Sequence, residues 1–196
     1  NPLRGMTTSR AQAIYDAARL GDTVELQWIY NEIEAADPTL MVCAERRSGA
    51  LASLDWTVLK RSERRVRGYD AGLADAQAAL LEQAYGEADA ANLTEAVEHL
   101  STAFFRGFAH AAPLFEGADR ELRGFDILRG WWFRRNLETG EWLWNPQARA
   151  YGRSADLQAI PTGELVSAVR TRHIDYPALP VYLRNAVGEK AWGQFM

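Results

Sequence analysis

Residues 130–146, GWWFRRNLETGEWLWNP, hold four of the chain's seven tryptophans. Thr139-Gly140 lies between two runs rich in aromatic residues, and Gly readily adopts the positive φ that tight hairpin turns need. The stretch therefore predicts a β-hairpin with a two-residue Thr-Gly loop. In that register Leu137 lies opposite Trp142, and Arg135 lies opposite Trp144.

Side chains alternate between the two faces of a strand, so this hairpin separates an apolar face from a largely polar one. The apolar face holds Trp131, Phe133, Arg135, Leu137, Trp142 and Trp144, and the polar face holds Trp132, Arg134, Asn136, Leu143 and Asn145. Such a split is typical of a sheet that is packed on one side and wet on the other.

Two interpretations of these rings and cations remain. In the first they form hairpin core, with Arg135 stacked on Trp144 as a cation–π pair. In the second they form a platform for nucleotide bases or sugars. On either interpretation, Trp132 and Arg134 on the polar face are candidates for contact with a partner.

Composition is that of an ordinary soluble globular protein. The 196 residues are 47% hydrophobic and 24% charged, enough for one sizeable domain. No apolar run approaches the roughly 20 residues needed to span a bilayer. The single cysteine, Cys43, excludes an internal disulfide framework and fits a reducing compartment. The net charge of −4 argues against a strongly basic nucleic-acid-binding domain, but it does not exclude a protein that lets DNA slide past.

The two ends of the sequence suggest an excerpt of a longer protein. The chain begins at Asn1 without an initiator Met, and it stops at Met196 within a segment, GEKAWGQFM, that has the character of a continuing helix. We therefore expect further residues on both sides.

The N-terminal residues 1–54 predict helices. Asp22 followed by Glu25 resembles a capping box, and Asp37-Pro38 predicts an N-cap followed by proline in the first helical turn. The helix that begins there continues to about Ser53.

Residues 55–196 predict a mixture of helices and strands. Helices are expected over 70–85 and 93–106, and strands over 56–59, 108–116 and 164–170, with Pro113 at an edge or a bulge. Trp56 is expected to be buried between the helices and the sheet. Pro177 and Pro180 predict a loop, so that the final helix begins near Val187. The fold class is α+β: a single domain, 1–196, in which the helical part packs on a small, mostly antiparallel sheet containing the hairpin.

A basic run follows the N-terminal helices. Lys60, Arg61, Arg64, Arg65 and Arg67 place five cations within eight residues. The run is either a solvated connector or a contact for phosphates or another partner.

Groups for catalysis are missing from the pattern. His99, His110 and His173 fall on different predicted elements, without Cys or carboxylates at metal-ligand spacing. Cys43 lies in a predicted helix, where a free thiol usually acts as a small hydrophobe. No glycine stretch has the spacing of a phosphate-binding loop. We therefore expect no enzyme activity, no cofactor and no metal site.

The order of several segments resembles the portal proteins of Mu-like phages and prophages. These segments are NPLRGMT, YNEIEAADPTLMVCAERRSGALASLDWTV, LTEAVEHLSTAFFRGFAHAAPLFEG and GEKAWGQFM. In that family an Asp-Pro passage, here Asp37-Pro38, leads into a long helix that ends in a tryptophan-bearing strand, here Asp55-Trp56. The passage from helix through glycine to strand matches residues 100–115, and the turn Leu122-Arg123-Gly124-Phe125 introduces the hairpin. The resemblance covers nearly the whole chain.

The resemblance implies a structural subunit of a ring, typically of twelve copies, at one vertex of an icosahedral head. Such a ring is the channel through which a terminase pumps double-stranded DNA, without sequence specificity, and it later joins the tail. Its partners would be other copies, terminase, capsid and tail-connector proteins, with no membrane. It would be assembled in the bacterial host cytoplasm and end in the virion. This segment would be part of the outer wing, with Trp132, Arg134 and the basic run as candidate subunit contacts.

A second function class stays open. Trp132, Arg134 and the basic run also fit a stand-alone α+β nucleic-acid-binding module. Duplex binding that weakens steeply with salt would favour this alternative.

Overall fold

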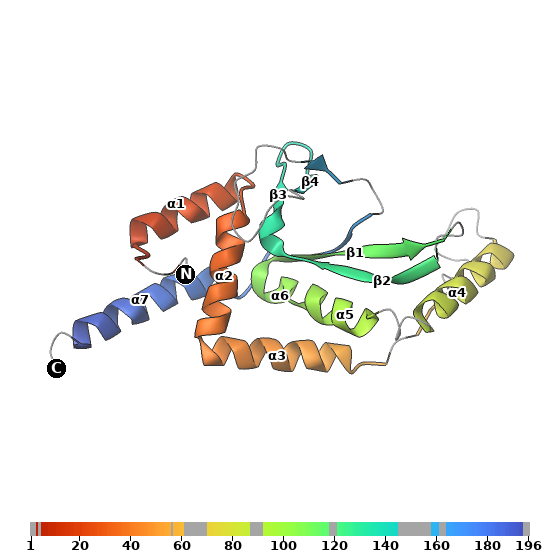
Figure 1. The fold of residues 1–196 in the computed structure, drawn as a ribbon, viewed down its shortest axis with the longest axis horizontal. Coiled ribbons are helices and arrows are strands. Elements are labelled where there is room, and N and C mark those ends of the chain that lie inside the picture. Colours follow the sequence, from red (N-terminus) through yellow and green to blue (C-terminus); the bar gives the residue numbers. More distant parts are fainter. Residues whose placement is uncertain are drawn as a thin grey trace.

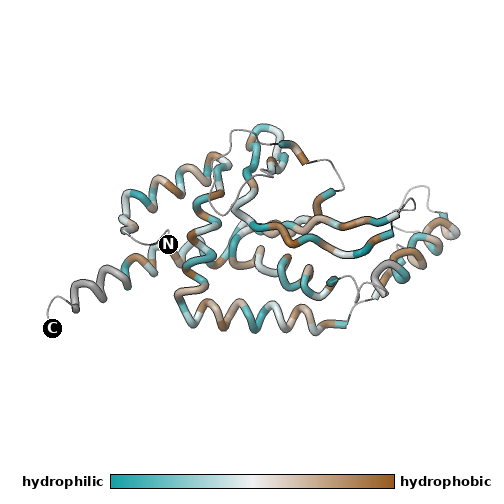
Figure 2. The backbone as a smooth tube through the Cα atoms, viewed as in Figure 1, coloured by the Kyte–Doolittle hydropathy of each residue, from teal (hydrophilic) through white to brown (hydrophobic). Residues whose placement is uncertain are grey.

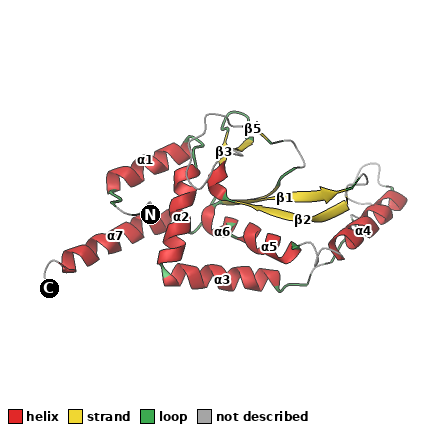
Figure 3. Cartoon of the chain, in the orientation of Figure 1, coloured by secondary structure: helices red, strands yellow, loops and turns green. Residues whose placement is uncertain are grey.

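The fold consists of helices arranged around two small antiparallel sheets (Figures 1 and 3). The structure is a computed structural model that describes residues 3, 5–55, 57–60, 70–86, 92–117, 121–144, 158–160 and 164–193. The α+β class predicted from the sequence is confirmed.

Three helices open the chain: α1 (Thr8–Arg19), α2 (Val24–Ala36) and α3 (Pro38–Ala52). The predicted start of α3 is confirmed, because the Asp37 carboxylate accepts hydrogen bonds from the N–H groups of Thr39, at 2.8 Å, and Leu40, at 3.1 Å. The predicted capping box of α2 is wrong. Thr23 occupies the N-cap position without a side-chain cap bond, and its hydroxyl donates to the carbonyl of Phe133 at 3.1 Å.

The first sheet has the strand order β2-β1-β6, built from β1 (Phe108–Glu116), β2 (Glu121–Leu128) and β6 (Val166–Val169). Both pairings are antiparallel, and β6 pairs only with residues 108–111 of β1. Pro113 therefore lies where β1 has a neighbour on one side only, next to a bulge between Leu114 and Phe115. This location agrees with the prediction of an edge or a bulge.

The second sheet contains the tryptophan-rich hairpin but in another register. A 3-10 turn, η3 (Gly130–Trp132), leads into β3 (Phe133–Arg135), which pairs with β4 (Trp142–Trp144), and β5 (Gln158–Ala159) completes the sheet. Arg135 lies opposite Trp142, and Phe133 lies opposite Trp144. The predicted pairs Leu137–Trp142 and Arg135–Trp144 are wrong by two residues.

The side chain of Asn136 explains the longer loop. Its Oδ1 accepts hydrogen bonds from the N–H groups of Glu138, at 2.9 Å, and Thr139, at 3.3 Å. The Asn136 N–H in turn donates to the carbonyl of Glu141 at 2.9 Å, so the loop has four residues, 137–140. Gly140 has the expected positive φ, +75°. Because a shift of two residues preserves the alternation, Phe133, Arg135, Trp142 and Trp144 keep their predicted common face.

The remaining helices are α4 (Ala71–Gly86), α5 (Leu93–Ser101), α6 (Ala103–Arg106) and α7 (Asp175–Gly193). Helix α4 agrees with the helix predicted over 70–85, and α5 and α6 together occupy the range 93–106 that was predicted as one helix, with an interruption at Thr102. The expected start of the last helix near Val187 is wrong, because α7 begins at Asp175 and includes both Pro177 and Pro180. The expected strand at 56–59 is absent from the described residues 57–59, and Trp56 lies outside the described residues.

The core is divided among three clusters, which fix how the layers stack. Helices α1, α2 and α7 enclose the first cluster, around Ile29, Tyr30 and Leu179. Helix α5 covers one face of the first sheet, where Ala96 packs against Ala111 and Phe125. The second sheet covers the other face; this cluster consists of Phe108, Leu128 and Phe133, with Trp142 and Trp144 packed against it.

The alternation along β1 follows directly from this stacking. Ala111 points toward α5, while Phe108 and His110 point toward the hairpin, where His110 lies 4.4 Å from the Phe133 ring centroid and 4.5 Å from that of Trp142. In Figure 2, hydrophobic residues also line α4 at the margin of the fold, where Leu73, Leu80 and Leu81 are exposed. Among the described residues, no helix is long and apolar enough to cross a membrane.

Candidate functional site

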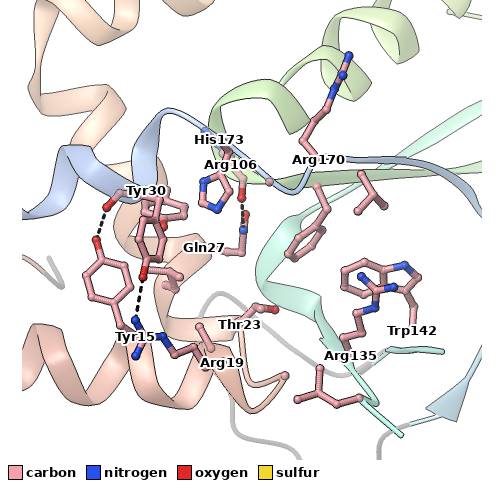
Figure 4. A pocket seen from close by; sticks show the side chains of 18 residues that line it. Tyr15, Arg19, Thr23, Gln27, Tyr30, Arg106, Arg135, Trp142, Arg170 and His173 are labelled. Atoms are coloured by element: carbon pink, nitrogen blue, oxygen red, sulfur yellow. Dashed lines mark hydrogen bonds between the residues drawn. The ribbon is translucent and has the colours of Figure 1, made fainter. Parts of the chain in front are cut away.

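A cleft of about 280 Å³ lies between the N-terminal helices and the two sheets, at the end of β1 that begins with Phe108 (Figure 4). Its described walls come from α1, α2, the start of α7, the ends of β3 and β6, and the start of β4. Aromatic rings from Tyr30, Phe108, Trp142, His173 and Tyr176 make up much of this surface.

Four arginines line the cleft. Arg106 is paired with Glu34, and the other three, from separate segments, add positive charge. Arg19 ends α1, Arg135 ends β3, and Arg170 follows β6. The described lining residues include no Asp or Glu. The cleft is therefore a local region of positive charge on a chain whose net charge is −4.

The three guanidinium groups are held differently. Arg19 donates to the Tyr176 hydroxyl at 3.2 Å and lies 3.4 Å from the carboxylate of Asp16. The guanidinium carbon of Arg135 lies 5.3 Å from the centroid of the Trp142 ring, a cation–π distance. Arg170 is exposed, and its side chain points away from Trp142 (Figure 4). An anionic group at the mouth of the cleft would meet cations on more than one side.

Two buried polar atoms belong to residues of the same walls. Within the described part of the chain, the Tyr30 hydroxyl and the Gln27 Oε1 have no hydrogen-bond partner. The other end of the Gln27 amide is satisfied, because its Nε2 donates to the carbonyl of Arg106 at 2.7 Å. Burial raises the pKa of Tyr30, and its neighbours Tyr15 and Asp175 add to this effect, so the hydroxyl stays a donor.

His173 contributes a neutral ring to the cleft. Its Nδ1 lies 3.2 Å from the carbonyl of Phe105, and burial lowers its pKa. A methyl group on Gly107 would approach this ring to 2.9 Å, so the close contact depends on glycine.

A buried acid lies behind the cleft. Asp175, the first residue of α7, is fully buried, and burial raises the pKa of its carboxyl to about 9, with Glu34 as the next cause. Glu34 also binds Arg106, whose Nε donates to Glu34 Oε1 at 2.8 Å. Glu34, Arg106 and Asp175 thus connect α2, α6 and α7 behind the part of the cleft wall that contains Tyr30 and His173.

The described walls offer guanidinium, hydroxyl and aromatic groups together with the imidazole of His173. Carboxylates, thiols and primary amines are absent from the described lining residues. No group of three or more His, Cys, Asp or Glu that could hold a metal ion occurs among the described residues.

The predicted partner contact Trp132 lies elsewhere and is partly buried. The expectation that it stands on an exposed polar face is wrong, because it belongs to the η3 turn and packs against the cluster of Phe108, Leu128 and Phe133. Its indole N–H is buried.

Arg134 lies on the opposite side of β3 from Arg135. It forms an ion pair of 2.8 Å with Asp22, and its side chain is 25% exposed. Much of its surface is therefore used within the subunit, where the pair ties the α1–α2 turn to the hairpin.

The basic run is described only at its first residue. Lys60 is paired with Asp75 of α4, and both side chains are more than half exposed. Arg61, Arg64, Arg65 and Arg67 lie outside the described residues. As subunit or nucleic-acid contacts, these residues, Trp132 and Arg134 remain predictions.

The sequence interpretation missed the cleft as a whole. Its arginines are spread over some 150 positions, and only Arg135 beside a tryptophan gave a local signal, which was assigned to Trp144 instead of Trp142.

Comparison with known proteins identifies a family. A search of curated proteins finds none that is similar to the chain. The family described as the portal protein of Mu bacteriophage, however, matches residues 27–187, which run from within α2 to within α7. The chain therefore belongs to the Mu bacteriophage portal protein family.

Proposed function

We propose that this protein is a structural subunit of a phage portal ring, the head-tail connector through which DNA is packaged and ejected. The observation that carries the proposal is the family match over residues 27–187, which takes in both sheets and the lining residues of the cleft from Gln27 onward. The family is one of structural proteins, and a structural subunit needs no catalytic group.

Surface apolar side chains support a role in assembly. Leu59 is 86% exposed, and Leu54, Leu73 and Leu80 are each more than half exposed. Isolated exposed leucines are common, but three on one helix, Leu73, Leu80 and Leu81 of α4, indicate a face with a partner. Neighbouring copies are the partner that a ring provides.

The wider role follows from the ring. In this proposal about twelve copies close around double-stranded DNA at one capsid vertex, and they contact capsid, terminase and tail-connector proteins. Assembly takes place in the bacterial cytoplasm, and the ring remains in the virion. The net charge of −4 limits phosphate contacts, which would otherwise hold passing DNA. The 196 residues are proposed to form a single wing domain.

A nucleic-acid-binding module is the second candidate, because the cleft combines Arg135 with Trp142 as a stacked cation and ring. A duplex-binding titration at several salt concentrations separates the two functions. The portal function predicts weak binding at all of them, and the module predicts tight binding at low salt that falls steeply as salt rises.

Negative-stain imaging of the full-length protein tests the proposed function itself. Closed rings with a central channel are expected. Images that show only small single particles, combined with salt-dependent duplex binding, would replace the portal function with the nucleic-acid-binding module.

A further inference from the structure

The two ends of strand β1 differ in shape and charge. Phe108, its first residue, lines the cleft, and Glu116, its last, ends the strand pairing with β2. Eight steps of about 3.3 Å separate these residues by roughly 26 Å. Figure 1 shows the β1–β2 pair extending from the helices α1 and α2 toward the opposite end of the molecule.

The far end of β1 and β2, here called the β1–β2 end, consists of residues 114–116 and 121–123. Leu114 is 50% exposed and Phe115 is 46% exposed. Glu116 and Glu121 are opposite each other, and Arg123 lies 2.9 Å from the first and 3.1 Å from the second. Two carboxylates share one guanidinium, so these three residues leave one negative charge beside apolar surface.

The cleft offers the complementary features. Its mouth includes Leu137 and Val169, both substantially exposed, and the rings of Trp142 and Tyr176. Arg19, Arg135 and Arg170 supply cations without an acid among the described lining residues. An apolar end with excess negative charge thus has a matching hollow with excess positive charge.

The geometry points to a head-to-tail contact in which the β1–β2 end of one copy inserts into the cleft of the next copy. A single chain cannot make this contact with itself, because the two sites lie at opposite ends of one strand. Contacts of this kind between two different surfaces generate closed rings or open filaments. The inference rests on the proposed portal function and assigns surfaces to the subunit interface of that ring.

A cysteine pair tests the contact directly. Cys43 is the only cysteine in the 196 residues and is exposed on α3. Cys43→Ser, together with Ser at any cysteine elsewhere in the full-length protein, first gives a cysteine-free background. Leu114→Cys and Val169→Cys then place one thiol at each surface. Val169 pairs with Phe108, six residues or about 20 Å from Leu114. A disulfide needs Cα atoms about 4.4–6.8 Å apart, so the two cysteines of one chain cannot join.

The full-length protein carrying both cysteines should form a ladder of disulfide-linked multimers on a non-reducing gel after mild oxidation. Each single-cysteine variant serves as a control and should give no species larger than a dimer. Absence of a ladder from protein that forms rings in images would overturn the head-to-tail contact while leaving the portal function in place. Absence of both ladder and rings would remove the portal function as well.

Charge reversal tests the polar part of the same contact. In the two-cysteine protein, Arg135→Glu or Arg170→Glu should reduce the ladder at least several-fold, and the added change Glu121→Arg should restore part of it. Arg46→Glu is the matched control, since Arg46 is an exposed arginine on α3, away from both surfaces. Melting curves of each variant verify folding. An undiminished ladder in both cleft variants, or an equal loss in Arg46→Glu, would contradict the charge complementarity.

Discussion

The hydroxyl of Tyr15 donates a hydrogen bond of 2.5 Å to the backbone carbonyl of Tyr176, which lies 161 residues later in the chain. In an uninterrupted helix this carbonyl would accept from the N–H of residue 180. That residue is Pro180, which has no N–H. Tyr15 therefore replaces the helical bond that Pro180 removes, and it ties α1 to the first turn of α7.

Tyr15→Phe should lower the free energy of unfolding by roughly 1 to 2 kcal/mol, because it leaves the Tyr176 carbonyl without its partner. Tyr182→Phe is the control: Tyr182 packs against the same cluster of α1, α2 and α7, and the structure shows no hydrogen bond from its hydroxyl to a described residue. Urea denaturation of both variants measures the difference. Equal loss in the two would show that the Tyr15 hydroxyl contributes no specific bond.

The start of α7 illustrates what sequence patterns could not predict. Two prolines in six residues favour a loop when only neighbouring residues are considered. Pro177 lies in the first turn, where its missing N–H is not needed. Pro180 is compatible with the helix because a hydroxyl arrives from α1, and no local pattern contains that information.

Features that depend on neighbouring residues were predicted well. Asp37-Pro38 caps α3, Gly107 ends α6 with a φ of +94°, and β1 covers the predicted residues 108–116. The predicted register of the tryptophan-rich hairpin is wrong because the N–H groups of Glu138 and Thr139 donate to the Asn136 side chain, which lengthens the loop beyond Thr-Gly. The cleft could not be predicted from local sequence patterns, because its arginines come together only after the helices and sheets have packed.

Gly21 should tolerate no side chain. Its φ is +89°, and an added Cβ would lie 2.0 Å from the carbonyl oxygen of Arg135, whose N–H donates to the Gly21 carbonyl at 3.0 Å. Gly21→Ala therefore combines the strain of a positive φ with a clash between the α1–α2 turn and β3.

Gly140→Ala isolates the strain from the clash, because Gly140 has a φ of +75° and nothing within 4 Å of an added Cβ. Overpacking typically costs about 1–3 kcal/mol, so Gly21→Ala should be destabilised by about that much more than Gly140→Ala. Thermal melts of the two variants give the comparison. Similar melting temperatures would mean that the contact between the turn and β3 is loose.

Asp175 should make stability depend on pH in a defined direction. Its carboxyl has an ordinary pKa of 3.8, and burial raises this pKa to about 9 in the folded protein. The protonated carboxyl therefore contributes to the stability of the folded protein, and this contribution is complete below pH 3.8. It is lost as the pH rises toward 9, because the unfolded chain releases the proton at a lower pH than the folded one.

Asp175→Asn keeps the size of the side chain but removes the titration. Its stability relative to the wild type should therefore rise between about pH 4 and pH 9, with a slope that approaches one proton. Denaturation at five or six pH values measures this, with Asp126→Asn, an exposed carboxyl on β2, as the control for lost charge. Parallel curves for Asp175→Asn and the wild type would contradict the raised pKa of Asp175.

The mass of the full-length protein in solution tests the central claim most directly. Light scattering over a range of micromolar concentrations should give one particle whose mass is a fixed integer multiple of the subunit and does not change on dilution, as expected for a closed ring. A full-length protein that stays strictly monomeric over that range would contradict its function as a portal subunit.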